Sequence, residues 1–144
     1  RQQSANGFFL GTYWNDLQEH EILVELRIPV IKPGVGHGYS KLKRKTGDYA
    51  VAGSPVVVEL DGDVCSDIRI ALTNVAPMAI RAEAAENILR GKVIDDALIE
   101  QAAAEVLAVC DPAEDLRGDI LYKSHMGAEM ARRSIRAALQ QARG

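Results

Sequence analysis

The chain has 144 residues, which is enough for one hydrophobic core of ordinary size. Apolar residues make up 47% and charged residues 26%, which excludes a disordered tail, and the net charge of −3 argues against a general binder of nucleic acid. No apolar stretch approaches the roughly 20 residues that a membrane-spanning helix needs.

The first 34 residues differ in character from the rest. Every Phe and the single Trp lie between residues 8 and 14, and "EILVELRIP" (21–29) predicts a strand that stops at Pro29. The run "KPGVGHG" (32–38) is typical of a linker or turn. We therefore expect a boundary between 1–34, the tail and linker of a preceding domain, and a second domain over 35–144. Since the chain begins at Arg1 without a Met, we expect it to be part of a longer protein.

Three strands are predicted next, at about 38–46, through "YAVAGSPVVVEL" (49–60), and through "VCSDIRIALTN" (64–74). Gly53 and Pro55 indicate a bulge or an edge position within the second strand. Alternation places two apolar sets on one face: Val56, Val58 and Leu60, and Val64, Ile68, Ile70 and Leu72. For both sets to face the core, the turn at 61–63 should have an odd length.

The second half of the chain is predicted to be helical. Segment 77–91 opens near a Pro and closes at a Gly, Asp95 can cap a second helix, and a third runs from about 120 to 142. On the second helix the apolar stripe is Leu98, Ala102, Val106 and Val109. The expected fold is α+β, with three to four antiparallel strands and three helices packed on one face. The other face must be polar or covered by a partner.

Few residues indicate self-contained chemistry. Cys65 and Cys110 lack a CxxC or Cys/His partner, so we expect reduced thiols on buried faces of a cytoplasmic protein. His20, His37 and His125 share no metal-ligand spacing, and no nucleophile elbow occurs. The sequence therefore predicts neither a metal centre nor a catalytic constellation within this chain.

The basic run at 41–45 is the exception. On a strand, Tyr39 and Lys41 point to the same side, and Lys41 closely follows the glycine-rich stretch. We interpret Lys43, Arg44 and Lys45 as cations that protect an edge strand. A lysine beside an aromatic ring at a domain boundary suits an anionic or electron-rich ligand, so Lys41 is the candidate binding residue.

Several segments carry a family resemblance. "GYSKLKRKTGDYAVA", "IRIALTNVAPMAIRAEAAENILRG" and "YKSHMGAEMARRSIRAAL" resemble the C-terminal domain of the FAD-binding subunit of molybdenum hydroxylases. The preceding "NGFFLGTYWNDLQEHEILVELRIP" resembles the end of that subunit's FAD-binding domain. The form "LKRKTGDYA" favours the medium, flavoprotein subunit of aerobic carbon monoxide dehydrogenase over xanthine dehydrogenase.

The resemblance implies a component of a hetero-oligomeric oxidoreductase. In such enzymes a large subunit carries the molybdenum cofactor, and a small iron–sulfur subunit carries two [2Fe–2S] clusters. The flavoprotein subunit then passes electrons from its FAD to an external acceptor. The loops that bind the FAD pyrophosphate would lie in the upstream FAD-binding domain, before Arg1. We therefore expect this fragment to be inactive alone.

The resemblance also implies the residues that meet the cofactor. Lys41, in "YSK", matches a lysine beside the flavin, Leu23, in "EIL", matches a backbone or apolar contact to it, and Tyr39 is expected to line the same seam. Leu23 is equally well explained as an ordinary buried strand residue. Two other functions remain open: a docking module without a direct flavin role, and nucleic-acid binding through 41–45. Net acidity and the lack of base-stacking aromatics near the run disfavour nucleic-acid binding.

Overall fold

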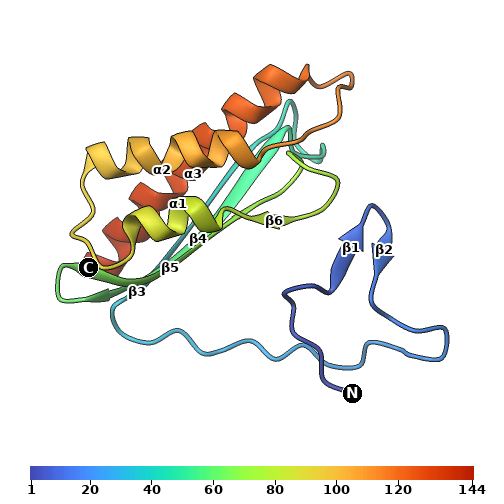
Figure 1. Ribbon diagram of the computed structural model, residues 1–144, viewed down its shortest axis with the longest axis horizontal. Coiled ribbons are helices and arrows are strands. Elements are labelled where there is room, and N and C mark those ends of the chain that lie inside the picture. Colours follow the sequence, from blue (N-terminus) through green and yellow to red (C-terminus); the bar gives the residue numbers. More distant parts are fainter.

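The computed structural model describes residues 1–144, which form two parts (Figure 1). In the N-terminal part, a small hairpin of β1 (Phe9–Gly11) and β2 (Trp14–Asn15) is followed by an extended segment. The second part begins with an antiparallel sheet whose strands lie in chain order: β3 (Val35–Leu42), β4 (Ala52–Asp61), β5 (Val64–Leu72) and β6 (Ile80–Arg81). Three helices follow: α1 (Glu83–Leu89), α2 (Asp96–Val109) and α3 (Ile120–Arg143). None of them is both long and apolar enough to cross a membrane.

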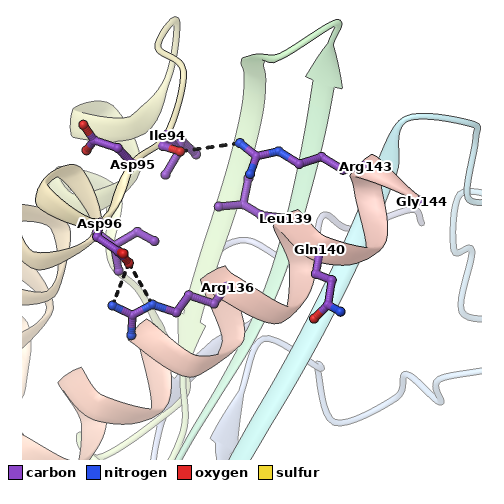
Figure 2. Close-up of a pocket in the computed structure, with 9 residues that line it drawn as sticks. Ile94, Asp95, Asp96, Arg136, Leu139, Gln140, Arg143 and Gly144 are labelled. Atoms are coloured by element: carbon purple, nitrogen blue, oxygen red, sulfur yellow. Dashed lines mark hydrogen bonds and ion pairs between the residues drawn. The ribbon is translucent and has the colours of Figure 1, made fainter.

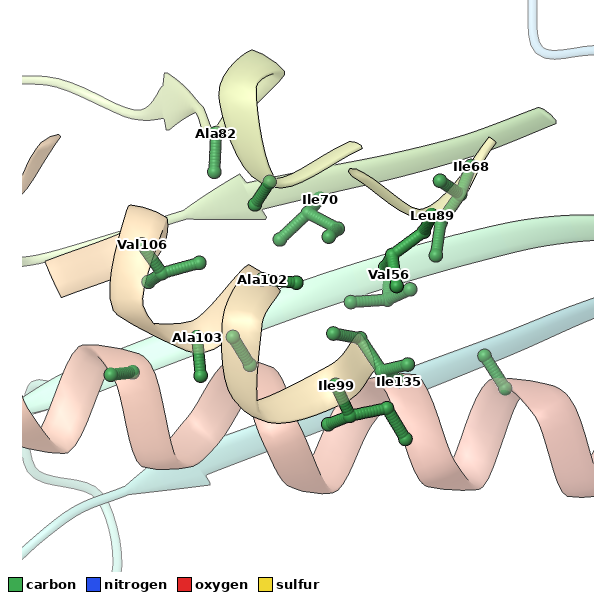
Figure 3. Packing of buried hydrophobic residues seen from close by; sticks show 14 of the residues in the cluster. Val56, Ile68, Ile70, Ala82, Leu89, Ile99, Ala102, Ala103, Val106 and Ile135 are labelled. Atoms are coloured by element: carbon green, nitrogen blue, oxygen red, sulfur yellow. The ribbon is translucent and has the colours of Figure 1, made fainter. Parts of the chain in front are cut away.

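All three helices cover the same face of the sheet, and the N-terminal part lies away from them, beyond the sheet (Figure 1). The predicted α+β architecture is therefore confirmed. Figure 3 shows side chains of β4 and β5 facing those of the helices. The apolar faces predicted for these strands form this core: Val56, Val58, Ile68, Ile70 and Leu72 are all buried. The other face of the sheet is left open.

The turn between β4 and β5 differs from the expectation. It consists of residues 62–63 only, so the predicted odd length is wrong. Ser66 is one extra residue on β5 and forms a β-bulge, in which its hydroxyl donates to the Glu59 carbonyl at 3.0 Å. Because the bulge shifts the register by one residue, Cys65 enters the core near the turn, and Val64 faces outward.

Segment 77–91 does not form the single helix predicted. Ile80 and Arg81 instead pair with the free edge of β5 as the strand β6, and α1 begins only at Glu83. The Pro and Gly residues at the ends of the segment predict where a helix starts and stops, but they do not indicate that the edge of β5 is available for pairing. Pairing with β5 gives these two residues ladder hydrogen bonds, and it adds the fourth strand of the sheet.

The other two helices follow the sequence signals closely. The Asp95 side chain accepts the Leu98 N–H at 2.8 Å, which confirms the predicted cap of α2, and α3 spans nearly the predicted range. The buried stripe of α2 is rotated from the prediction: Ile99 and Ala103 are buried, whereas Leu98 packs on the core only in part and Val109 is exposed.

The first part of the glycine-rich run, residues 32–34, forms the predicted turn, but from Val35 onward the run belongs to strand β3 and is not a linker. Gly36 and Gly38 lie in β3 and face α3. A Cβ atom at either position would come within 3.0 Å of a backbone oxygen of the helix, that of Ala138 or of Ser134. The glycines are therefore required for close packing of α3 on the sheet.

The predicted strand at 21–29 is also absent. Residues 22–31 are extended but make no backbone hydrogen bond. The alternate apolar side chains of this segment are between 75% and 90% exposed: Ile22, Val24, Leu26, Ile28 and Val30. A strand needs a paired neighbour, and none lies beside these residues. The apolar alternation typical of a strand is present, but no neighbouring strand pairs with the segment.

Candidate functional site

Two of the predicted site residues stand side by side on the open face of the sheet. Along β3, Gly36 and Gly38 face α3, so Tyr39 and Lys41, at positions of the opposite parity, point away from the helices. Both residues are exposed, and the exposed fraction of Tyr39 is 61%. The structure thus brings Tyr39 and Lys41 together on a surface that no other element covers.

A glycine on the neighbouring strand gives the aromatic ring its place. Gly53 lies opposite Lys41, and a Cβ atom there would be 3.4 Å from the Tyr39 hydroxyl oxygen and 3.5 Å from Cε2 of its ring. The Tyr39 side chain therefore lies over Gly53, next to Lys41. Gly53 and Pro55 mark neither an edge nor a bulge, because β4 is a central strand and its pairing with β3 is unbroken at both residues.

The rest of the basic run lies outside the strand. The sequence predicts that Lys43, Arg44 and Lys45 protect a strand edge. That prediction is wrong, because β3 ends at Leu42. The Arg44 guanidinium instead donates to Asp48 at 3.4 Å and to the Leu116 carbonyl at 3.1 Å. These contacts hold the loop that follows β3 against the loop that precedes α3.

Leu23 is not joined to this pair. It lies within the unpaired segment 22–31, its side chain is 52% exposed, and no hydrogen bond links it to Tyr39 or Lys41. The alternative interpretation, an ordinary buried strand residue, is wrong for the same reasons. The backbone and side chain of Leu23 are both free to contact another group.

A cavity of about 470 Å³ lies at the end of the sheet where β3 ends and β4 begins. It is bounded by the turn of the β1–β2 hairpin and by loops that follow β3, β5 and α2. The hairpin is tied to this end because the Thr12 hydroxyl donates to the Pro77 carbonyl at 2.9 Å. The lining includes Tyr13, Tyr49, Asn74, Asp115, Arg117 and Lys123.

The charged side chains that line this cavity are all paired. Arg117 pairs with Asp48 at 3.2 Å and with Asp115 at 3.4 Å, and the Lys123 ammonium lies 2.7 Å from Asp115. The hydrogen bond from Lys123 and the neighbouring Arg117 lower the pKa of Asp115 to about 2. The Arg117 Nε is buried without an acceptor, so one strong donor is unused. Arg117 also lies over the Tyr49 ring, with 5.6 Å from its Cζ to the ring centroid.

Backbone strain converges on the same cavity. Tyr13 (φ 56°) and Asn74 (φ 65°) are the two residues other than glycine with left-handed backbone, and both line it. Such strain is concentrated at ligand clamps and active sites. Sequence reasoning missed the cavity because its lining comes from distant segments. The one local signal is Asn74, since Asn tolerates this conformation, and it does not indicate a site by itself.

A larger cavity, about 560 Å³, separates the start of α2 from the end of α3 (Figure 2). Figure 2 shows that its two arginines already have partners: Arg136 pairs with Asp96 at 2.9 Å, and Arg143 donates to the Ile94 carbonyl at 3.5 Å. It lies at the end of α3 that packs on the start of β3, whereas Lys41 is near the other end of that strand. We therefore interpret it as a structural junction.

The open face and the smaller cavity share one end of the sheet and offer compatible chemistry. Tyr39 and Tyr49 present exposed aromatic surface, Lys41 supplies a positive charge, and Arg117 has an unused donor. Each charged side chain that lines the cavity is engaged in an ion pair. Such a surface suits a planar ring with hydrogen-bond acceptors and a tendency to become negatively charged.

Residues 37–138 match the family described as CO dehydrogenase flavoprotein C-terminal domain. The chain is 50% identical to the carbon monoxide dehydrogenase medium chain of Hydrogenophaga pseudoflava over 138 residues, which cover 96% of this chain and 48% of the relative. The medium chain of Afipia carboxidovorans is 38% identical over 140 residues, 97% of this chain and 49% of the relative.

A solved structure agrees in fold. Carbon monoxide dehydrogenase from Hydrogenophaga pseudoflava, in a form that lacks the Mo-pyranopterin moiety of the molybdenum cofactor, gives a TM-score of 0.92 at 52% identity. The match covers 94% of this chain and 47% of that one. The chain thus spans about half the length of the relatives that it matches. It belongs to the family of CO dehydrogenase flavoprotein C-terminal domains.

Proposed function

We propose that the chain is part of the FAD-carrying electron-transfer subunit of a molybdenum hydroxylase of the carbon monoxide dehydrogenase type. In this role FAD passes electrons from [2Fe–2S] clusters to an external acceptor. Family membership supports the class of enzyme. The observation that carries the cofactor role is the pair Tyr39 and Lys41, exposed together on the uncovered face of the sheet.

The residues at this face fit a flavin. FAD, when bound, takes up and releases electrons through its isoalloxazine ring. Lys41 supplies a positive charge that stabilises negative charge on a reduced ring, and Tyr39 offers an aromatic surface beside it. Leu23 contributes a backbone or apolar contact from its unpaired segment.

The N-terminal part supports a neighbouring domain. We propose that residues 1–34 are the tail of an FAD-binding domain of the same polypeptide and that 35–144 form the second domain. Ten residues with free backbone groups and alternating apolar side chains, 22–31, are suited to pair as a strand with that domain. The relatives, about twice as long, leave room for it.

The partner subunits are also part of the proposal. An iron–sulfur small subunit and a molybdenum large subunit would complete the complex, in the cytoplasm. The medium-chain relatives support a multi-subunit assembly. The two free thiols, Cys65 and Cys110, are compatible with a reducing compartment.

A second function has one observation in its favour. Leu116 is 94% exposed, and Ile120 and Leu121, at the start of α3, are 53% and 68% exposed. Exposed apolar side chains gathered at one end of a domain are typical of an interface. The domain would then be a docking module for another subunit, with all flavin chemistry upstream.

The variant Lys41→Met in the full-length, assembled enzyme distinguishes the two. If Lys41 faces the flavin, the variant lowers the flavin midpoint potential or weakens FAD retention, because a stabilising positive charge is lost. Lys92→Met is the matched control, since Lys92 is exposed at the end of the sheet where β5 begins. Unchanged potential and unchanged FAD content in Lys41→Met would remove Lys41 from the site and favour the docking module.

A further inference from the structure

A serine of α3 reaches into the sheet directly beneath the predicted flavin-facing residues. Ser134 is fully buried, and its hydroxyl accepts the Ser40 N–H at 2.8 Å and donates to the Ser54 carbonyl at 2.6 Å. Ser40 lies between Tyr39 and Lys41 in β3. The hydroxyl therefore bridges β3 and β4 at the position where the two open-face residues emerge.

The bridge continues to the third strand. Gly53 and Thr73 exchange two backbone hydrogen bonds, of 3.1 and 2.9 Å. Because the backbone groups of every second residue face the same neighbouring strand, those of residue 55 also face β5, opposite Ala71. Pro55 has no N–H to offer, and the Ser54 hydroxyl donates to the Ala71 carbonyl instead, at 3.0 Å. Two serine hydroxyls thus join three strands at one level of the sheet.

The close approach of α3 is what lets so short a side chain reach the strands. A Cβ atom at position 38 would lie within 3.0 Å of the Ser134 backbone oxygen, so a glycine is required there. A buried hydroxyl with both a donor and an acceptor partner is costly to remove, because both partners lose a hydrogen bond in a dry environment. The local geometry of β3 is therefore fixed from the helix side.

We propose that Ser134 is a positioning residue that holds Lys41 and Tyr39 in place against the flavin. The inference rests on the proposed function of Lys41. Ser134 is on the other face of the sheet from the cofactor, so it acts only through the Ser40 backbone. Its removal should let this part of β3 relax and should weaken the effect of the Lys41 charge on the ring.

The test is the flavin midpoint potential of the full-length, assembled enzyme. Ser134→Ala should lower it in the same direction as Lys41→Met, by a smaller shift. Ser124→Ala is the matched control, because Ser124 is buried in the same helix but its hydroxyl donates only to the Ile120 carbonyl one turn away, at 2.8 Å. It should leave the potential unchanged. In the Lys41→Met background, Ser134→Ala should add no further shift.

The outcomes separate the two proposals. An unchanged potential in Ser134→Ala, with a lowered one in Lys41→Met, would overturn the positioning role and leave the proposed function standing. A double variant whose shift equals the sum of the two single-variant shifts would overturn it too, since Ser134 would then act independently of Lys41. An unchanged potential together with unchanged FAD content in Lys41→Met would remove Lys41 from the site and overturn the proposed cofactor role itself. If Ser134→Ala does not assemble, Ser134→Cys keeps a weaker donor and acceptor in place; it should give a smaller shift, and an unchanged potential would overturn the inference.

Discussion

Substitution of Glu86 by Gln should cost this fold about 3 kcal/mol. The carboxylate is fully buried and accepts four hydrogen bonds: from the Ile70 N–H at 2.8 Å, from Arg81 at 2.6 and 2.6 Å, and from Arg90 at 2.7 Å. Breaking a buried ion pair by removing one partner costs about 3–5 kcal/mol. The lower end applies here, because both arginine side chains are about one-third exposed and can regain water.

The effect should depend on pH in a defined direction. Burial alone would raise the pKa of Glu86, but the hydrogen bonds from Arg81 and the Ile70 N–H, with the two guanidinium charges, outweigh it and lower that pKa. A carboxylate whose pKa is lower in the folded state stabilises the fold above its unfolded pKa, about 4.3. This contribution is lost as the pH falls through the folded-state pKa. The difference between parent and variant should therefore be complete at neutral pH and shrink in acid.

Urea denaturation followed by circular dichroism, from neutral pH down to about pH 3, measures both quantities. Glu129→Gln is the control, since this carboxylate also meets two arginines, Arg132 and Arg133, but at the surface. Its loss should not exceed about 1 kcal/mol. A Glu86→Gln loss no larger than that of the control, or one that stays constant in acid, would refute the reasoning.

Two further predictions concern close packing and the thiols. Gly36→Ala should lower the free energy of unfolding by roughly 1–3 kcal/mol, because the new methyl group meets the Ala138 backbone oxygen; a urea midpoint equal to that of the parent would contradict the close contact with α3. Burial raises the pKa of Cys65 and of Cys110 to about 11, so iodoacetamide at pH 8 should label the folded chain far more slowly than the unfolded chain. Labelling at equal rates in the two states would show that the thiols are accessible.

Sequence reasoning predicted best the elements whose signals are local. The Asp95 cap and the long amphipathic pattern of α3 are contained within the helices themselves, and both were found. The bulge at Ser66 and the strand at Ile80–Arg81 depend on hydrogen bonds to another strand, which no local pattern specifies. The features that were missed are therefore those that depend on a neighbouring strand and carry no local pattern of their own.

The same division holds at the site. Tyr39 and Lys41 were placed on one side by strand alternation, which needs only their spacing of two residues. Ser134 lies 94 residues from Ser40, and nothing in the sequence distinguishes it from Ser124 in the same helix. Only the packing of α3 against the sheet singles it out. The two residues that we propose to face the flavin could thus be predicted from the sequence, whereas the proposed positioning residue could not.

The segment 22–31 shows what an alternating pattern does establish. Burial of one large apolar side chain is worth about 1.5–3 kcal/mol, so its five exposed, alternate side chains represent roughly 10 kcal/mol of unused stabilisation. That is comparable with the stability of a whole domain, and it is available only if a partner pairs with the segment. Residues 35–144, in contrast, contain a core cluster of 22 buried residues. Leu23 can therefore be fixed at a flavin only through the partner of its segment, whereas Lys41 is already held in place by the sheet and α3.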